Sequence, residues 1–307
     1  MKDMRVVFMG TPDFAVASLD ALLKAGFNVV GVVTAPDKPA GRGLKLTESA
    51  VKTYATNHNL PVLQPEKLKS PEFLNALADL AADIQVIVAF RMLPEVVWNM
   101  PPLGTINVHG SVLPKYRGAA PINWAVINGE KETGVTTFKL QHAIDTGNIL
   151  LQKSFIIGDN ETAGEVHDRM KLVGAELLVQ TLTGIRENTI QEIPQPFAGN
   201  IPHAPKIFSE TGRIDWNKNV DVVYNLIRGL SPSPGAYTLL DGKTLKIFRA
   251  EKESGNDSEQ PGKVRTDEKT YLKFAAADGF IRVDELQLEG KKKMSVTEFL
   301  RGYRFKN

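Results

Sequence analysis

The chain has 307 residues, of which 42% are hydrophobic and 23% charged, so long disordered, collagen-like or low-complexity segments are excluded. The 37 Lys and Arg nearly balance the 35 Asp and Glu, and a net charge of +2 excludes a polycationic coat for nucleic acid. Because the chain has no Cys, disulfide frameworks, thiolate metal sites and Cys nucleophiles are also excluded.

The first half of the chain alternates apolar strands with helices. Residues 5–10 and 28–34 are β-branched apolar runs, and apolar residues recur at helical spacing between them. We expect further helices and strands, with helices at 49–59, 71–80, 93–100, 119–128 and 162–187 and strands at 84–90, 105–109, 135–140 and 149–157. This order predicts an α/β fold with an open doubly wound, mainly parallel, Rossmann-like sheet over residues 1–189. The run at 5–10 is too short for a signal sequence or a membrane span, so we expect a cytoplasmic protein with no membrane segment.

The pattern changes after residue 190. Pro194, Pro196 and Pro205 fit neither a helix nor a central strand, and they predict a linker at 190–207. We then expect a helix and short strands, with the helix at 220–229 and strands at 237–240, 245–249, 263–264, 271–275 and 281–288. Short strands separated by turns are typical of a small β-barrel, which we place in residues 208–307.

The loop after the first strand argues against a nucleotide site. Gly10-Thr11-Pro12 has neither the spaced glycines of a dinucleotide fingerprint nor the Gly-Lys-Ser/Thr ending of a phosphate loop. The sequence therefore lacks the motifs that would best support an ATP or NAD site. Because open α/β sheets bind ligands at the carboxyl ends of their strands, we expect the site there.

Asn107 and His109 form the most informative pair. In a strand over 105–109 they share one face, about 6 to 7 Å apart, and Gly110 and Ser111 end the strand directly after them. An amide donor beside an imidazole can bind an oxyanion and move a proton, as acyl transfer through a tetrahedral intermediate requires. The alternative is an Asn and a His that serve only the structure at a strand end.

Asp145 is the candidate third partner. It lies in a turn between two apolar strands, and a carboxylate near His109 would fix the tautomer of the ring and favour its imidazolium form. The alternative is an Asp that only caps its turn. The other histidines, His58, His142, His167 and His203, form no His-x-x-x-His pair, so we expect no metal.

The motifs together resemble one enzyme family. Five segments, taken in order and spacing, are similar to the methionyl-tRNA formyltransferases, a family of folate-dependent formyltransferases: residues 8–14, 39–43, 107–109, 111–118 and 145–147. Three later segments also resemble that family: residues 213–216, 232–235 and 290–294. The sequence departs from the family at Val112, where Leu is usual, and at Lys115-Tyr116, where Arg-Trp or Arg-Tyr is common.

The resemblance implies an activity and a set of residues. It implies transfer of the formyl group of 10-formyltetrahydrofolate, a cosubstrate, to the α-amino group of methionine on initiator methionyl-tRNA, by a catalytic triad of Asn107, His109 and Asp145. The segment placed against the folate is Ser111, Val112, Leu113 and Pro114. The basic residues expected at the acceptor end of the tRNA are Lys38, Arg42 and Lys45. The resemblance also makes the barrel at 208–307 an OB-like tRNA-binding domain, and we expect a monomer.

Two alternatives remain. A formyltransferase acting on a nucleotide-linked amino sugar would share the first domain and the triad, and His109-Gly110 and Asn123-Trp124 favour it slightly. The basic loop at 36–46 favours tRNA, since such a loop suits a polyanion, although a solvated surface loop would read the same way. A non-catalytic RNA-binding protein is disfavoured because all three triad residues are present.

Overall fold

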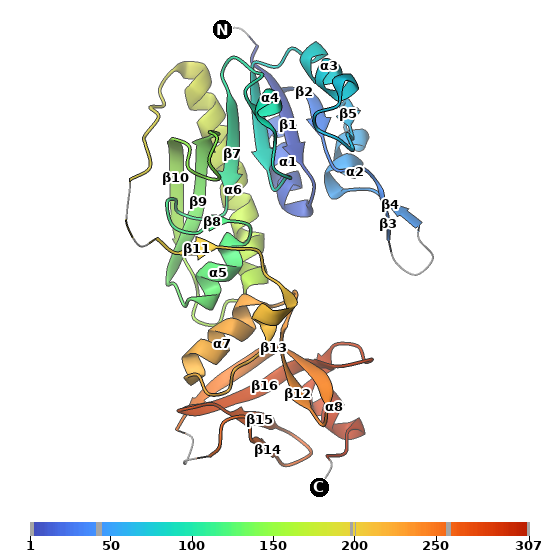
Figure 1. Cartoon of the computed structure of the whole chain (residues 1–307), viewed down its shortest axis with the longest axis vertical. Helices are drawn as coiled ribbons and strands as arrows, with labels where there is room; N and C mark the ends of the chain where they lie inside the picture. The colour runs from blue at the N-terminus through green and yellow to red at the C-terminus, as the bar shows by residue number, and fades with distance from the viewer. Residues whose placement is uncertain (1–2, 41–44, 197–198, 200, 256–258, 306–307) are drawn as a thin grey trace. The chain divides into compact units, whose positions relative to one another are not determined.

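The chain packs as two compact units. The computed structural model describes residues 3–40, 45–196, 199, 201–255 and 259–305 (Figure 1). Unit 1 comprises Met1–Arg117, Gly134–Phe155 and His167–Pro202, and unit 2 comprises Gly118–Thr133, Ile156–Val166 and His203–Asn307. Two segments of the predicted first domain thus pack with the C-terminal region. The predicted boundaries at 189 and 208 stay a prediction.

Unit 1 is built on a seven-stranded sheet. Its strands follow the order β10-β9-β7-β6-β1-β2-β5, and they are β1 (Arg5–Gly10), β2 (Asn28–Val33), β5 (Val62–Leu63), β6 (Ile84–Val88), β7 (Thr105–His109), β9 (Glu132–Lys139) and β10 (Ile149–Ile156). The pairs from β5 to β7 are parallel, and β9 runs antiparallel to β7. The predicted open, mainly parallel sheet is confirmed. Its strand order reverses direction at β1, where such sheets open towards a ligand.

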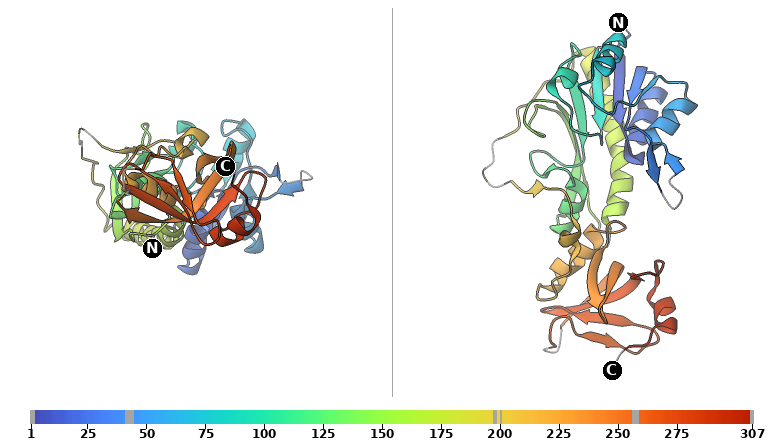
Figure 2. Two further views of the ribbon diagram at one scale, coloured as in Figure 1. Left: turned by 90° about the horizontal axis from the view of Figure 1, so that it is seen from below. Right: turned by 45° about the vertical axis from the view of Figure 1, so that its right-hand side comes forward.

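Helices cover the sheet on both faces (Figures 1 and 2). They are α1 (Asp13–Lys24), α2 (Ala50–Asn57), α3 (Pro71–Asp79), α4 (Glu95–Trp98) and α6 (Ala163–Glu187). On one face Val7 and Met9 of β1 share a buried cluster with Phe73 of α3, because alternate residues of a strand point to one side. On the other face α6 comes close to β7, where Gly174 lies against Val108. Burial on both faces accounts for the continuous apolar runs in the sequence.

A short hairpin stands where the sequence predicted only a loop. Strands β3 (Lys38–Ala40) and β4 (Lys45–Thr47) pair antiparallel. Its base is fixed by Asp37, which accepts hydrogen bonds from Lys52 and, at 2.7 Å, from Gln64. The Lys52 ammonium holds the pKa of Asp37 below its ordinary value, and the carboxylate raises the pKa of Lys52 in return.

Unit 2 is a curled antiparallel sheet with helices against it. The sheet contains β12 (Ala236–Leu240), β13 (Lys243–Ser254), β16 (Gly279–Leu288), β15 (Leu272–Ala275) and β14 (Val264–Thr266), with β17 (Met294–Ser295) on β16. Its core includes Trp216 stacked on Phe274 at a centroid distance of 4.8 Å. The predicted small barrel-like domain of short strands is confirmed, as a curled antiparallel half-barrel. Other elements are α5 (Pro121–Ile127), α7 (Val220–Gly229), α8 (Val296–Gly302), β8 (Arg117–Gly118), β11 (His203–Ala204) and a 3-10 turn at Ser209–Gly212.

The sequence did not predict α8, although it carries a readable start signal. Ser295 accepts a hydrogen bond from the backbone of Glu298, whose carboxylate accepts from the backbone of Ser295 in return. This reciprocal capping box is encoded by the Ser-x-x-Glu spacing. Within the described residues, no helix is long and apolar enough to cross a membrane.

Gly134 in β9 gives a first test of the sheet. A Cβ there would lie 2.3 Å from the Lys153 carbonyl oxygen and 2.8 Å from the Ser154 Cα, so the two strands would have to separate. We expect Gly134→Ala to lower the free energy of unfolding, measured in urea, by about 1 to 3 kcal/mol. Gly302→Ala is the control, because nothing lies within 4 Å of that position. Equal stability of the two variants would contradict the close approach.

Candidate active site

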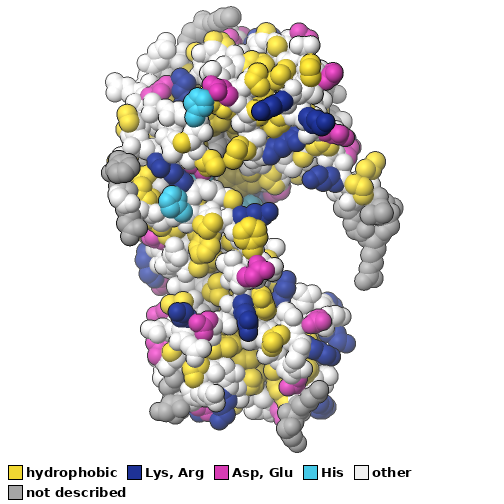
Figure 3. All heavy atoms as spheres, viewed as in Figure 1, with side chains coloured by type: hydrophobic (Ala, Val, Ile, Leu, Met, Phe, Trp, Pro, Cys, Tyr) yellow, Lys and Arg dark blue, Asp and Glu magenta, His cyan; other side chains and the backbone are white. Residues whose placement is uncertain are grey.

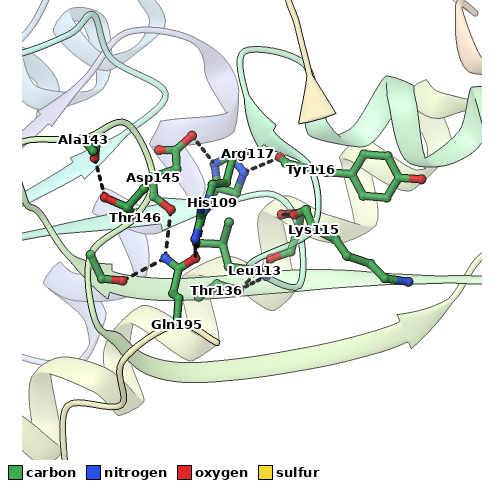
Figure 4. A network of polar contacts seen from close by, with 12 residues as sticks. His109, Leu113, Lys115, Tyr116, Arg117, Thr136, Ala143, Asp145, Thr146 and Gln195 are labelled. Carbon is green, nitrogen blue, oxygen red and sulfur yellow. Dashed lines mark hydrogen bonds and ion pairs between the residues drawn. The ribbon is translucent and has the colours of Figure 1, made fainter. Parts of the chain in front are cut away.

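The candidate site lies at the carboxyl edge of the sheet. Strand β7 ends at His109, and the turn that follows β9 carries Asp145 (Figure 4). Because β7 and β9 run antiparallel, β9 ends at Lys139 opposite Ile106, near the start of β7, and the turn after it folds back to bring Asp145 to His109. This places polar side chains where open α/β sheets bind their ligands.

The His109 ring is buried and held on one side by a backbone carbonyl. The residue is 6% exposed, and its Nε2 lies 2.9 Å from the carbonyl oxygen of Tyr116. A carbonyl only accepts, so Nε2 carries the proton and donates it. Phe138 presents an edge contact to the ring at 6.4 Å between centroids. The ring is therefore fixed in both orientation and tautomer.

Asp145 faces the other ring nitrogen. Its Oδ2 lies 3.8 Å from the His109 Nδ1, and its side chain is 13% exposed. This separation exceeds a hydrogen bond, so the contact is an ion pair when the ring is protonated. The structure thus brings together His109 and Asp145, two residues 36 positions apart in the chain.

Asn107 is the uncommitted member of the predicted triad. It is half-buried on β7, two residues before His109, and so projects from the same face of the strand. Among the described residues, none exchanges a hydrogen bond with its side chain. A half-exposed amide without a protein partner can donate to a substrate oxygen.

The loop at 111–114 is tied down by the neighbouring strands. The Thr136 hydroxyl donates to the Ser111 carbonyl at 2.7 Å and accepts from the Leu113 backbone at 3.0 Å. Gln152 donates to the Leu113 carbonyl at 2.8 Å and to the Thr136 hydroxyl at 2.9 Å. The Ser111 hydroxyl donates to the Lys115 carbonyl at 2.6 Å. Every polar group named here has a protein partner, so the loop has a defined shape.

The predicted folate-contact residues divide into two pairs. Ser111 and Leu113 are buried, at 0% and 2% exposed, whereas Val112 and Pro114 are half-buried. The inner pair therefore shapes the loop, and the outer pair offers apolar surface. Contact with folate stays a prediction for all four.

Two of the three predicted tRNA-contact residues, Lys38 and Lys45, belong to the hairpin formed by β3 and β4. Lys38 is exposed on β3. Arg42 lies outside the described residues, as does the side chain of Lys45, whose backbone forms part of β4. The structure therefore describes the two strands of this hairpin and the side chain of Lys38.

Gln195 and Arg117 were not found by sequence reasoning. Gln195 donates hydrogen bonds to the carbonyls of Asp145 and Gly147, both at 2.8 Å, and accepts two from Arg117 at 3.1 and 2.6 Å (Figure 4). Gln195 lies in the segment predicted as a linker, where neutral polar residues carry no functional signal. In the part of the chain that the structure describes, no group of three or more His, Asp or Glu could hold a metal.

The sequence matches two models of one family along most of its length. Residues 4–182 match the model described as formyl transferase, and residues 206–304 match the model described as formyl transferase, C-terminal domain. The chain belongs to the formyl transferase family. Curated members named methionyl-tRNA formyltransferase include proteins of Bacteroides fragilis, 53% identical over 98% of this chain and 96% of that protein, and Parabacteroides distasonis, 54% identical over 99% and 97%. The resemblance identified from the motifs is confirmed.

Solved structures of other proteins share the fold. An N-formyltransferase from Helicobacter canadensis, in complex with folinic acid and dTDP-3-aminofucose, superimposes with a TM-score of 0.68 at 21% identity, covering 95% of this chain and all of the other. HypX from Aquifex aeolicus, in complex with tetrahydrofolic acid, gives a TM-score of 0.64 at 19% identity, covering 99% of this chain and 49% of that chain. At these identities the likeness concerns the fold alone.

The Thr136 hydroxyl gives a test of how the formyl transferase loop is held. Thr136→Val keeps the shape of the side chain but leaves the Leu113 backbone amide and the Ser111 carbonyl without their partner. We expect a loss of about 1 to 3 kcal/mol in the free energy of unfolding in urea. Thr136→Ser retains the hydroxyl and should recover most of the loss. Equal stability of the Val variant and the wild type would show that the loop does not depend on this contact.

Proposed function

We propose that the chain transfers the formyl group of 10-formyltetrahydrofolate to the α-amino group of methionine on initiator methionyl-tRNA. The product is N-formylmethionyl-tRNA, which serves translation initiation. The observation that carries this proposal is the near-complete match to proteins named methionyl-tRNA formyltransferase, at 53% identity over 98% of the chain. The geometry supports it, because an uncommitted amide, a fixed imidazole and a carboxylate meet at the carboxyl edge of the sheet.

Asn107 would stabilise the charge that develops during transfer. When bound, the folate supplies an amide-like formyl carbonyl on a nitrogen leaving group. The amine forms a bond to this carbon while an electron pair moves onto the carbonyl oxygen, and the carbon–nitrogen bond to the folate then breaks. The amide of Asn107 can donate to that oxygen, which is more negative in the transition state than in the substrate.

His109 and Asp145 would handle the proton. The Nε2 proton of His109 is committed to Tyr116, so only Nδ1 is available for exchange. At 3.8 Å the Asp145 carboxylate can stabilise a charged ring while leaving Nδ1–H free to point at a substrate oxygen. The attacking amine loses one proton and the leaving nitrogen gains one, so the ring ends the reaction unchanged. No covalent enzyme intermediate is required.

Apolar surface near the triad suits the planar ring of a folate. Val112 and Pro114 are half-buried, Ile144 beside Asp145 is 60% exposed, and Met92, which follows β6, is 73% exposed. Figure 3 shows hydrophobic side chains next to Lys and Arg side chains on the visible face of unit 1. Such a surface fits a ligand that combines a flat ring with acidic groups. We assign Ser111, Val112, Leu113 and Pro114 to this part of the site.

The tRNA would contact the hairpin of β3 and β4 through Lys38, Arg42 and Lys45. Residues 208–307 would hold the body of the tRNA as an OB-like domain. A chain cut at residue 207 cannot test this division, because residues 118–133 and 156–166 pack in unit 2 and would lose their partners. Point substitutions are therefore the suitable test. We retain the expectation of a cytoplasmic monomer, since tRNA charging and translation share that compartment and the proposed site comes from one chain.

Acceptance assays distinguish the alternatives. The purified protein is mixed with 10-formyltetrahydrofolate and either initiator methionyl-tRNA or a nucleotide-linked amino sugar. The mass of each acceptor is then measured by mass spectrometry. We expect one formyl group on methionine and none on the sugar. Formylation of the sugar alone would establish the sugar enzyme. No product with either acceptor, together with binding of tRNA, would establish a non-catalytic RNA-binding protein.

The triad variants give a second prediction. We expect Asn107→Ala and His109→Ala to lower kcat by about 100-fold or more with little change in folate affinity, because both residues act mainly on transition-state charge. Asp145→Asn removes the charge facing Nδ1 and should also lower kcat, because the ring loses the carboxylate beside its exchanging nitrogen. Variants that keep near-normal turnover would remove these residues from the chemistry.

Arg42→Ala tests the basic hairpin. A guanidinium bound to phosphate releases counterions, so its loss should raise the KM for methionyl-tRNA and reduce the slope of its salt dependence by about one, while folate binding is unchanged. Lys24→Ala, at an exposed position of α1, is the charge-matched control. If both variants behave like the wild type at every salt concentration, the hairpin does not bind tRNA.

A further inference from the structure

Residues 192–195 form a strap across the hairpin of β9 and β10. The backbone of Ile193 exchanges two hydrogen bonds with Ile149 at the start of β10, at 2.7 and 2.9 Å. Glu192 accepts hydrogen bonds from Lys139 and Asn148, which lower its pKa below the ordinary value. The strap is thus fastened to both ends of the turn that carries Asp145, and it is more than a spacer.

Gln195 is the residue of the strap that reaches the turn. Its Nε2 donates one hydrogen to the Asp145 carbonyl and the other to the Gly147 carbonyl, both at 2.8 Å. A side-chain amide has two donor hydrogens, so both are used. Gln195 therefore bridges the two backbone carbonyls that flank Thr146 and sets the spacing between them.

Arg117 sets the direction of the Gln195 amide. Its Nε and Nη2 donate to the Gln195 Oε1 at 3.1 and 2.6 Å. Since Arg only donates, the oxygen of the amide must face Arg117 and the nitrogen must face the turn. Arg117 directly follows Tyr116, whose carbonyl accepts from His109. His109, Tyr116, Arg117, Gln195 and Asp145 therefore form a closed circuit, in which Tyr116 and Arg117 are joined by a peptide bond and the other neighbours by the contacts given above.

Asp145 needs such support because of its backbone. Its φ of 54° lies in the left-handed region, which costs a residue with a side chain about 1 kcal/mol or more. Gly147 lies two residues on, where a Cβ would stand 1.7 Å from the Lys139 carbonyl oxygen. The two hydrogen bonds from Gln195 thus hold a turn whose backbone is both left-handed at Asp145 and closely packed at Gly147.

We propose that Gln195, oriented by Arg117, is a positioning residue that holds the Asp145 carboxylate against the His109 Nδ1. It touches neither substrate nor reacting atoms and acts through Asp145. The kinetic test of this inference rests on the proposed function. The hydrogen-exchange test rests only on the geometry of the turn.

The kinetic experiment uses the full chain with Gln195→Ala, Gln195→Glu, Arg117→Lys and the control Glu176→Ala. Loss of the amide should lower kcat about 10- to 100-fold with KM for both substrates changed by less than about twofold, since misplacing a catalytic group by about 1 Å costs this much. Gln195→Glu should be as slow, because a carboxylate cannot donate to the two carbonyls. Arg117→Lys keeps one donor to the Gln195 oxygen, so its kcat should lie between those of Gln195→Ala and the wild type. Glu176→Ala removes only an exposed ion pair with Lys153, away from the strap, and should match the wild type.

A double-variant cycle tests whether Gln195 acts through Asp145. If it does, Asp145→Asn combined with Gln195→Ala should be no slower than Asp145→Asn alone. If kcat of the double variant falls by the product of the two single-variant factors, the proposal is overturned. A wild-type kcat in Gln195→Ala would overturn it as well. Thermal unfolding of each variant separates a kinetic effect from loss of the fold.

Hydrogen exchange supplies a readout that needs no activity. Peptides covering residues 143–147 should take up deuterium faster in Gln195→Ala than in the wild type or in Glu176→Ala. Unchanged uptake would overturn the positioning role whether or not the enzyme formylates tRNA. Faster uptake in a protein without activity on methionyl-tRNA would support the positioning role while refuting the proposed function.

Discussion

The His109 ring is held from opposite sides by two groups that can only accept, the carbonyl of Tyr116 and the carboxylate of Asp145. This arrangement decides which nitrogen carries a fixed proton and which can exchange one. It also requires that the end of β7, the turn after β9 and the segment that follows α6 meet in one place. The seven-stranded sheet brings these segments together, because β7 and β9 are neighbours in it and Ile193 of the segment after α6 pairs with Ile149 of β10.

Holding the ring this way strains the backbone on both sides. Tyr116 and Asp145, the two residues that flank the ring, both have left-handed φ values, of 59° and 54°. Each costs about 1 kcal/mol or more and persists only where the surroundings fix it. Thr136 and Gln152 secure the loop that leads to Tyr116, and Gln195 secures the turn of Asp145. Strain at the site is thus balanced by hydrogen bonds from residues with no part in the chemistry.

The sequence predicted most of what depends on local pattern. The alternation of apolar runs with helical spacing placed the parallel sheet, and the period of a strand placed Asn107 and His109 on one face. The turn with Asp145 was identified because its chemistry complements a His. Gln195 could not be found in this way, since its partners lie 48, 50 and 78 residues away and nothing local distinguishes it from any polar residue between two prolines. The interleaving of the two units was missed for the same reason, because α5 and the segment after β10 look like ordinary parts of the first domain.

The order of segments in unit 2 has a consequence for synthesis of the chain. Asn123 of α5 donates to the carbonyl of Gly229 at the end of α7, across 106 residues of sequence. At a ribosomal rate of about 5–20 residues per second, α5 waits roughly 5 to 20 s for its partner after it has been made. During that interval unit 1 can complete its sheet, while the side of α5 that α7 later covers remains open to water. The nascent chain therefore passes through a stage in which the strands of unit 1 have been made while α5 still lacks the helix that covers it.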